Sequence, residues 1–453
     1  MVDTINIGMK HAKQWKASSL LSASIVTGCM VIAAPVFAET DAQHIKDLED
    51  HLQTVQIFAE TDAQHMKDLE DHLQAIQNEL SQMASGMANR SDSGEGLPMH
   101  GFMDVGFASN SQGNAAANPN IANPKGFYEG RLSFYLSPHF SDNVKVLAEP
   151  NIEVSQGDGT INLDVERLQI GYTFSDTATV WGGRFHTPYG YWNTAFHHGA
   201  QLQTAVLRPR FLDFEDSGGI LPAHMLGVWG TGKVKAGEGK LTYDGYAGNG
   251  PKIAGAVTPD LSTIPPTYQT GGLNPNIAGD DNHSAMVGLN LGYEFSGNMD
   301  GLRLAVHWLQ GDVNAYDSTP TTLNTTNLNI TGGSAVYLSN DWEVMSEYYA
   351  FNNKDKSTDV KHKSWAGYLQ AGRSFDDLTP YVRFERAVFD QLDNYFSMQA
   401  SGQSYARQAL GLRYNLNQKA ALKLELLNSS FKPEPGRTAL GYRSLLFQYA
   451  IGF

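Results

Sequence analysis

The stretch that decides the fold is "LLFQYAIGF", residues 445–453, in which large apolar side chains alternate with smaller or polar ones. Successive side chains of a β-strand point to opposite faces, so this alternation predicts a strand with one apolar face. A soluble protein would have to bury that face, whereas a membrane barrel can turn it towards lipid. The last residue, Phe453, suits the closing strand of such a barrel.

The same alternation recurs from Met99 onwards, for example in "MVGLNLGYEF", "LRLAVHWL" and "ARQALGLRYNL". Such runs predict sixteen strands, at 99–109, 126–137, 142–154, 160–174, 176–187, 222–233, 238–248, 283–296, 300–311, 328–339, 341–352, 362–375, 378–390, 403–416, 418–431 and 440–453. Tight Asn/Asp/Ser-rich turns alternate with long connections, notably 187–221, 249–282 and 312–327. The pattern predicts an all-β fold, a transmembrane antiparallel β-barrel over 99–453. A soluble β-sandwich would mimic a single run but not the whole series.

The first 38 residues have the pattern of a secretory signal peptide. Three lysines precede an apolar run that ends in Val36-Phe37-Ala38, which suits cleavage before Glu39. A lipoprotein-type site at Cys29 is the alternative, although the apolar run continues well beyond it. Cys29 is the only cysteine, so the mature chain is predicted to contain no disulfide.

A duplicated helix follows the signal peptide. "FAETDAQHIKDLEDHLQTVQ" begins at Phe37 and "FAETDAQHMKDLEDHLQAIQ" at Phe58, a period of 21 residues or three heptads. Apolar residues at alternating spacings of three and four predict a coiled coil over 39–83, with a trimer preferred. Residues 84–98 carry Gly, Ser, Asp and Pro without periodicity and are predicted to be a linker.

The composition excludes several classes of function. The formal net charge of −15 argues against nucleic acid as a partner. The chain contains no nucleophile elbow, Walker loop or zinc signature, so neither an enzyme nor a cofactor is predicted. The histidines and acids of "AFHH…DFED" have no recognised ligand spacing, so no metal site is predicted either.

The connection between the fifth and sixth strands is the best candidate for a functional loop, because long loops without regular structure are usually functional. If it folds into the barrel, it brings a group of aromatic and basic side chains to a constriction. That group comprises His186, Tyr189, Tyr191, Trp192, His197, His198, Arg208 and Arg210. The alternative is that the loop packs over the mouth and only braces the barrel.

Strand alternation also predicts basic side chains that line the lumen. Arg131, Arg167 and Arg184 belong to the second, fourth and fifth strands, and Arg383, Arg407 and Arg413 to the thirteenth and fourteenth. Two such walls would favour anions, since charge lining a narrow pore sets its preference. The alternative is that each arginine pairs with a carboxylate on a neighbouring strand.

The run "GGRFHTPYGYW" resembles an edge motif of the phosphate-selective porin O and P family, through Gly183, Arg184, Phe185, Pro188 and Gly190. The order of coiled coil, linker, barrel and terminal Phe is also similar to that of the family's wider relatives. This resemblance implies a homotrimeric channel for small anions in the outer membrane of a Gram-negative bacterium, with the coiled coil in the periplasm. It also implies that the barrel-insertion machinery reads Phe453. The chain lacks that family's dense ladder of Arg and Lys, so phosphate is not the expected solute.

The expected function is therefore ion transport by passive diffusion: a lipid-embedded porin for small hydrophilic solutes that leans towards anions. The alternative is structural, with a barrel that the coiled coil tethers to the periplasm or cell wall.

Overall fold

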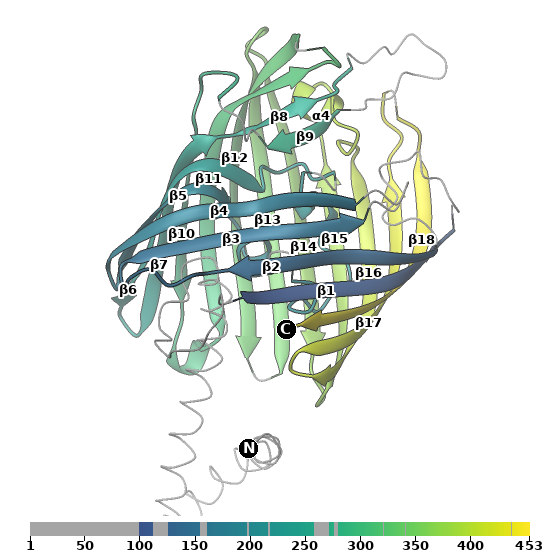
Figure 1. Cartoon of the computed structure of the whole chain (residues 1–453). Helices are drawn as coiled ribbons and strands as arrows, with labels where there is room; N and C mark the ends of the chain where they lie inside the picture. Colours follow the sequence, from purple (N-terminus) through teal and green to yellow (C-terminus); the bar gives the residue numbers. More distant parts are fainter. Residues whose placement is uncertain are drawn as a thin grey trace, which may run out of the picture. The chain divides into compact units, whose positions relative to one another are not determined.

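The computed structural model describes residues 99–111, 126–154, 161–196, 199–215, 218–257, 271–275, 280–319, 321–339, 341–435 and 437–453. The predicted signal peptide, coiled coil and linker lie outside these residues. Figure 1 shows the described strands arranged around a single barrel.

Sixteen long strands form the barrel within the described residues. They are β1 (Met99–Asn110), β2 (Gly126–Leu136), β3 (Val144–Val154), β4 (Ile161–Ser175), β5 (Ala178–His186), β6 (His224–Ala236), β7 (Gly239–Asn249), β10 (Met286–Glu294), β11 (Leu302–Tyr316), β12 (Thr322–Ser339), β13 (Trp342–Asp355), β14 (Lys361–Arg373), β15 (Leu378–Val388), β16 (Tyr405–Asn417), β17 (Ala420–Phe431) and β18 (Leu440–Gly452). The prediction of a sixteen-stranded barrel is confirmed, and most strand ends agree to within three residues.

The barrel closes where the first and last strands pair. β18 runs antiparallel to β1, with Val105 opposite Tyr449. Beyond the end of β18, the amide of Phe453 donates to the carbonyl of Gly101 at 2.9 Å, and Gly101 donates back at 3.0 Å. β18 therefore has hydrogen-bonding partners on both edges, β1 on one side and β17 on the other. A strand in a membrane requires this, because lipid offers no partner for backbone groups.

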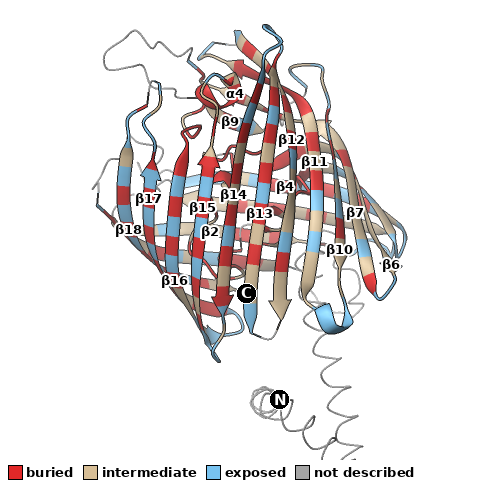
Figure 2. Cartoon of the chain, turned by 180° about the vertical axis from the view of Figure 1, so that it is seen from behind, coloured by how far each residue is buried: buried red, intermediate tan, exposed pale blue. Residues whose placement is uncertain are grey.

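Burial alternates along β14–β18, as Figure 2 shows. On β18, Leu445, Phe447 and Tyr449 are about two-fifths exposed, whereas Leu446 and Ala450 are fully buried. The outward side chains are apolar and large, which is the character of a lipid-facing surface. The lumen side carries the polar and charged residues.

Two predicted connections differ from the structure. The connection 312–327 was expected to be a long loop, but β11 and β12 extend through most of it and leave only 317–321 between them. The connection 249–282 contains a short hairpin of β8 (Pro251–Ala254) and β9 (Gly272–Pro275). Short helical turns complete the elements: α3 (Trp192–Ala195), η1 (Arg210–Leu212), η2 (Gly297–Met299) and α4 (Asn394–Ser397).

In the part of the chain that the structure describes, no helix is long and apolar enough to cross a membrane.

Candidate functional site

The connection between β5 and β6, residues 187–223, folds into the barrel, and we call it the inward loop. Its described part contains α3 and η1. The sequence left two positions open for this loop, inside the barrel or packed over its mouth. In the structure the loop lies inside. The loop enters through a sharp turn at Gly190, whose φ of +64° suits glycine. A side chain there would collide with the carboxylate of Glu347.

The inward loop lies against the lumen-facing side chains of β13–β17, which we call the docking wall. Glutamates of this wall accept hydrogen bonds from the loop: Trp192 N to Glu347 at 2.8 Å, Thr204 Oγ1 to Glu343 at 2.6 Å, Val206 N to Glu425 at 3.2 Å and Arg210 N to Glu385 at 2.8 Å. Carboxylates that accept backbone N–H groups make strong, charge-assisted bonds. Acidic residues that the alternation places in the lumen thus hold the loop.

Basic residues of the docking wall bind the loop through its carbonyl oxygens. Arg383 Nη1 donates to Leu207 O at 2.8 Å, and Arg413 Nη1 donates to Gln203 O at 2.8 Å. Lys423, which the sequence reasoning did not select for the constriction, donates to the carbonyls of Ala200 and Ala205. The docking wall therefore provides acceptors for N–H groups of the inward loop and donors for its C=O groups. The loop needs such partners because its backbone is not paired with a strand.

Arg383, Arg407 and Arg413 thus do not form an open basic surface. Arg383 also pairs with Glu385 at 2.9 Å, and both side chains are fully buried. Arg407 donates to Ser429 Oγ at 3.0 Å and to the Tyr442 hydroxyl at 3.2 Å. This second predicted wall lies beneath the inward loop and stabilises its position.

Apolar packing joins the loop to the same wall. Trp192 and Phe211 of the loop are at most 1% exposed. Their rings meet Tyr368 and Tyr349 of the wall edge-on, with centroid separations of 5.7 and 5.5 Å. The largest hydrophobic core of the described residues therefore lies inside the barrel, between loop and wall.

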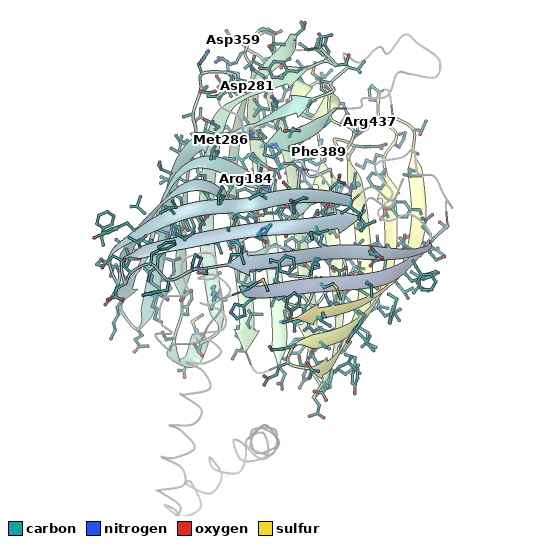
Figure 3. The ribbon with its side chains drawn as sticks, viewed as in Figure 1. Arg184, Asp281, Met286, Asp359, Phe389 and Arg437 are labelled. Atoms are coloured by element: carbon teal, nitrogen blue, oxygen red, sulfur yellow. The ribbon has the colours of Figure 1, made fainter. Side chains whose placement is uncertain are left out.

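The first predicted basic wall pairs across neighbouring strands. Arg131 forms an ion pair with Glu153, and Arg167 pairs with Glu149 at 2.5 Å. Arg184 donates from Nε to the carbonyl of Glu166 at 3.0 Å. In Figure 3, Arg184 lies lower in the barrel than Phe389 and Arg437.

The remaining predicted constriction residues lie on or beside the inward loop, except His197 and His198, which fall outside the described residues. Tyr189 and His186 are buried, and Tyr191 borders the cavity described below. The Arg208 guanidinium lies 3.8 Å above the Phe214 ring and forms no hydrogen bond with the described residues. Burial lowers the pKa of Arg208 to about 10 and raises the pKa of Asp213 to about 6.

A cavity of about 710 Å³ separates the free side of the inward loop from β3–β7 and β10–β12. Its charged lining comprises Lys145, Arg167, Lys233 and Arg303 together with Asp176, Asp244, Glu294 and Glu343. Arg303 and Glu294 lie 3.9 Å apart, and Glu343 is bonded to Thr204 and Gln370. Among the described residues, neither Lys145 nor Lys233 lies within 4.0 Å of a carboxylate oxygen. The lumen is thus packed on one side of the loop and open on the other.

The short helix α4 lies near one end of the barrel, which we call the mouth (Figure 1). Phe396 of α4 stacks on Phe389 at 4.3 Å, and Tyr395 donates to the inward loop at Ile220 O, 2.6 Å away. Arg437, before β18, donates to Gln399 O at 2.6 Å (Figure 3). These contacts connect the mouth to the inward loop.

Sequence reasoning missed three things at this site: the loop-binding role of the wall glutamates, Lys233 as a cavity residue, and a cluster of Glu166, His186 and His224. The alternation of the strands did place Lys145 in the lumen. Glu343 and Glu347, four residues apart on the same face of β13, were the available signal for the first. No local spacing signals the third, because its members come from three strands.

No family model and no curated protein matches the chain. Three solved structures are similar in fold. The outer membrane channel DcaP of Acinetobacter baumannii has a TM-score of 0.50 at 11% identity, over 81% of this chain and 99% of that one. The anion-selective porin of Comamonas acidovorans has a TM-score of 0.49 at 12% identity, over 79% and 99%. The trimer form of OmpT, an outer membrane protein of Vibrio cholerae, has 0.48 at 10% identity, over 79% and 99%.

At these identities the likeness concerns the fold. The chain has the porin-like barrel fold of outer-membrane proteins, and membership of the phosphate-selective porin O and P family stays a prediction.

Proposed function

We propose that this protein is an outer-membrane porin, a passive diffusion channel for small hydrophilic solutes. The observation that carries the proposal is the polar cavity of about 710 Å³ inside a closed barrel, between the inward loop and β3–β7. The outward face of the strands is apolar, which suits lipid, and the lumen face is charged. A barrel without a path through it would not need to leave one side of its lumen open and polar.

The same proposal includes a preference of the channel for anions over cations. Most lining carboxylates have partners: Glu343 is hydrogen-bonded, Glu294 lies near Arg303, and Asp244 accepts from Trp229 and Asn290. Among the described residues, no carboxylate oxygen lies within 4.0 Å of Lys145 or Lys233, so these side chains are available to a passing solute. Unpaired positive charge lowers the free energy of an anion in a narrow pore.

The expected result in planar bilayers is discrete conductance from purified protein, with a reversal potential in a salt gradient that reports anion preference. Lys145→Gln and Lys233→Gln should each reduce the anion-to-cation permeability ratio. Lys354→Gln, on the exposed part of β13 beyond the cavity, is the matched control and should leave the ratio unchanged. Absence of discrete conductance would refute the channel, and an unchanged ratio in both cavity variants would refute only the anion preference.

The proposal includes a homotrimer joined by the coiled coil of 39–83. Deleting residues 39–96 should leave the conductance of each barrel intact while the trimer dissociates at lower detergent concentration, because an a/d seam adds interhelical packing. Analytical ultracentrifugation of the full-length and shortened chains measures the difference. Loss of all conductance on deletion would contradict this division of roles.

A further inference from the structure

Two histidines face each other at the neck of the inward loop. His186 ends β5 and His224 begins β6, and the two residues are directly paired across the strands. Their rings are 4.7 Å apart and nearly perpendicular. Both are at most 5% exposed. The chain leaves the barrel wall at one imidazole and rejoins it at the other.

A β-bulge brings a carboxylate to the same point. On β4, Arg167 pairs with Glu149 and Val165 with Pro150, so Glu166 is the extra residue between them. The bulge turns both Glu166 and Arg167 inward, which strict alternation would not allow. Bulges re-aim side chains and are often found next to functional sites. Glu166 Oε2 lies 2.6 Å from His224 Nε2.

Glu215 of the inward loop holds the opposite side of the same imidazole. Its Oε2 lies 2.9 Å from His224 Nδ1, and its Oε1 accepts the backbone N–H of His224 at 2.9 Å. A carboxylate on one ring nitrogen fixes the tautomer and presents the other nitrogen as a ligand. Phe214 stacks on His224 at 5.4 Å and shields the group.

We propose that Glu166, His186 and His224 bind one divalent transition-metal ion of the zinc type, with Glu215 as the positioning residue for His224. One ligand atom from each of the three residues lies within 4.8 Å of the others. Two imidazoles and one carboxylate are a donor set that zinc prefers, with a fourth position left for water or a solute.

The geometry requires little movement to accept the ion. Zinc bonds of about 2.0–2.1 Å place tetrahedral ligand atoms roughly 3.3 Å apart. The contact between Glu166 and His224, now 2.6 Å, therefore opens by less than about 1 Å, and no pair of ligand atoms closes by more than about 1.5 Å. Glu166 keeps its other oxygen towards Arg131, at 3.9 Å. An ion here would join β4, β5 and β6 at the neck of the inward loop.

The test measures zinc bound by the full-length protein in detergent after dialysis against buffered Zn²⁺. Wild type should hold one ion per chain more than His186→Asn or Glu166→Gln. Glu215→Gln should weaken binding about 10–100-fold, as loss of an orienting carboxylate does. His362→Asn is the control, because His362 is a buried histidine that pairs with only one carboxylate, Asp390 at 2.8 Å. His362→Asn should keep the zinc content of the wild type. The other histidines of the chain are present in wild type and in the ligand variants, so their contribution cancels.

A second measurement needs no variant. Co²⁺ added to the metal-free wild type should produce the visible absorption of a four-coordinate site, and one equivalent of Zn²⁺ should abolish it. Equal zinc content in wild type and the ligand variants would overturn the proposal, as would the absence of the Co²⁺ band. Either result would leave Glu166, His224 and Glu215 as a buried hydrogen-bonded group without a metal.

Discussion

The variant Glu385→Ala is expected to lose about 3–5 kcal/mol of unfolding free energy, the usual cost of removing one partner from a buried ion pair. Glu385 joins a buried ion pair of the docking wall to the backbone of the inward loop. It pairs with Arg383 at 2.9 Å and accepts from the amide of Arg210 at 2.8 Å. Without it, the guanidinium of Arg383 and the loop amide both lose an acceptor in a region that water does not reach. Urea unfolding in micelles, followed by tryptophan fluorescence, measures the loss.

Asp359→Asn is the matched control for that measurement, because Asn tolerates the φ of +61° that residue 359 adopts. Asp359 pairs with Lys354 at 2.5 Å, but its side chain is 78% exposed. Exposed ion pairs contribute about 0–1 kcal/mol, so this variant should unfold close to wild type. Equal losses in the two variants would mean that the docking wall does not stabilise the inward loop.

Replacing residues 189–221 with a four-residue Gly/Ser turn is expected to raise single-channel conductance several-fold. The inward loop fills the side of the lumen next to β13–β17, and its removal leaves that space to water and ions. A short turn can close the gap, because the strands on either side of the loop are directly paired at its neck. Single-channel recording in planar bilayers measures the change.

Shortening the 356–360 connection by two residues is the corresponding control. That connection joins β13 and β14 outside the cavity, so conductance should stay at the wild-type value. If the loop replacement also leaves conductance unchanged, the inward loop is not the constriction, and the narrowest point must lie elsewhere, for example at α4.

The strands could be predicted because lipid on one side and water on the other impose a period of two on every spanning segment. β11 and β12 were predicted too short for the same reason. The segment "TLNTTNLN", residues 322–329, carries polar residues on both faces although it pairs regularly with β11. Its buried face carries Asn324 and Thr326, so burial there leaves no apolar alternation in the sequence. The alternation of apolar and polar residues can therefore mark a strand only along the part that faces lipid.

The position of the inward loop could not be predicted, because its partners are far away in sequence. Trp192 and Glu347 are 155 residues apart, and Val206 and Glu425 are 219 apart. The sequence shows that such acids face the lumen, but not whether water or backbone occupies the space before them. The same limit applies to the cluster at the loop neck, where a bulge sets the direction of Glu166.

The one-sided attachment of the inward loop has a consequence for blocking agents. On the proposed channel function, a solute travels through the cavity along β3–β7, and the inward loop occupies the lumen next to β13–β17. An inhibitor shaped to plug the middle of the barrel would meet the loop before it met the conducting route. A small, elongated anion that reaches Lys145 and Lys233 along that edge is the better starting shape.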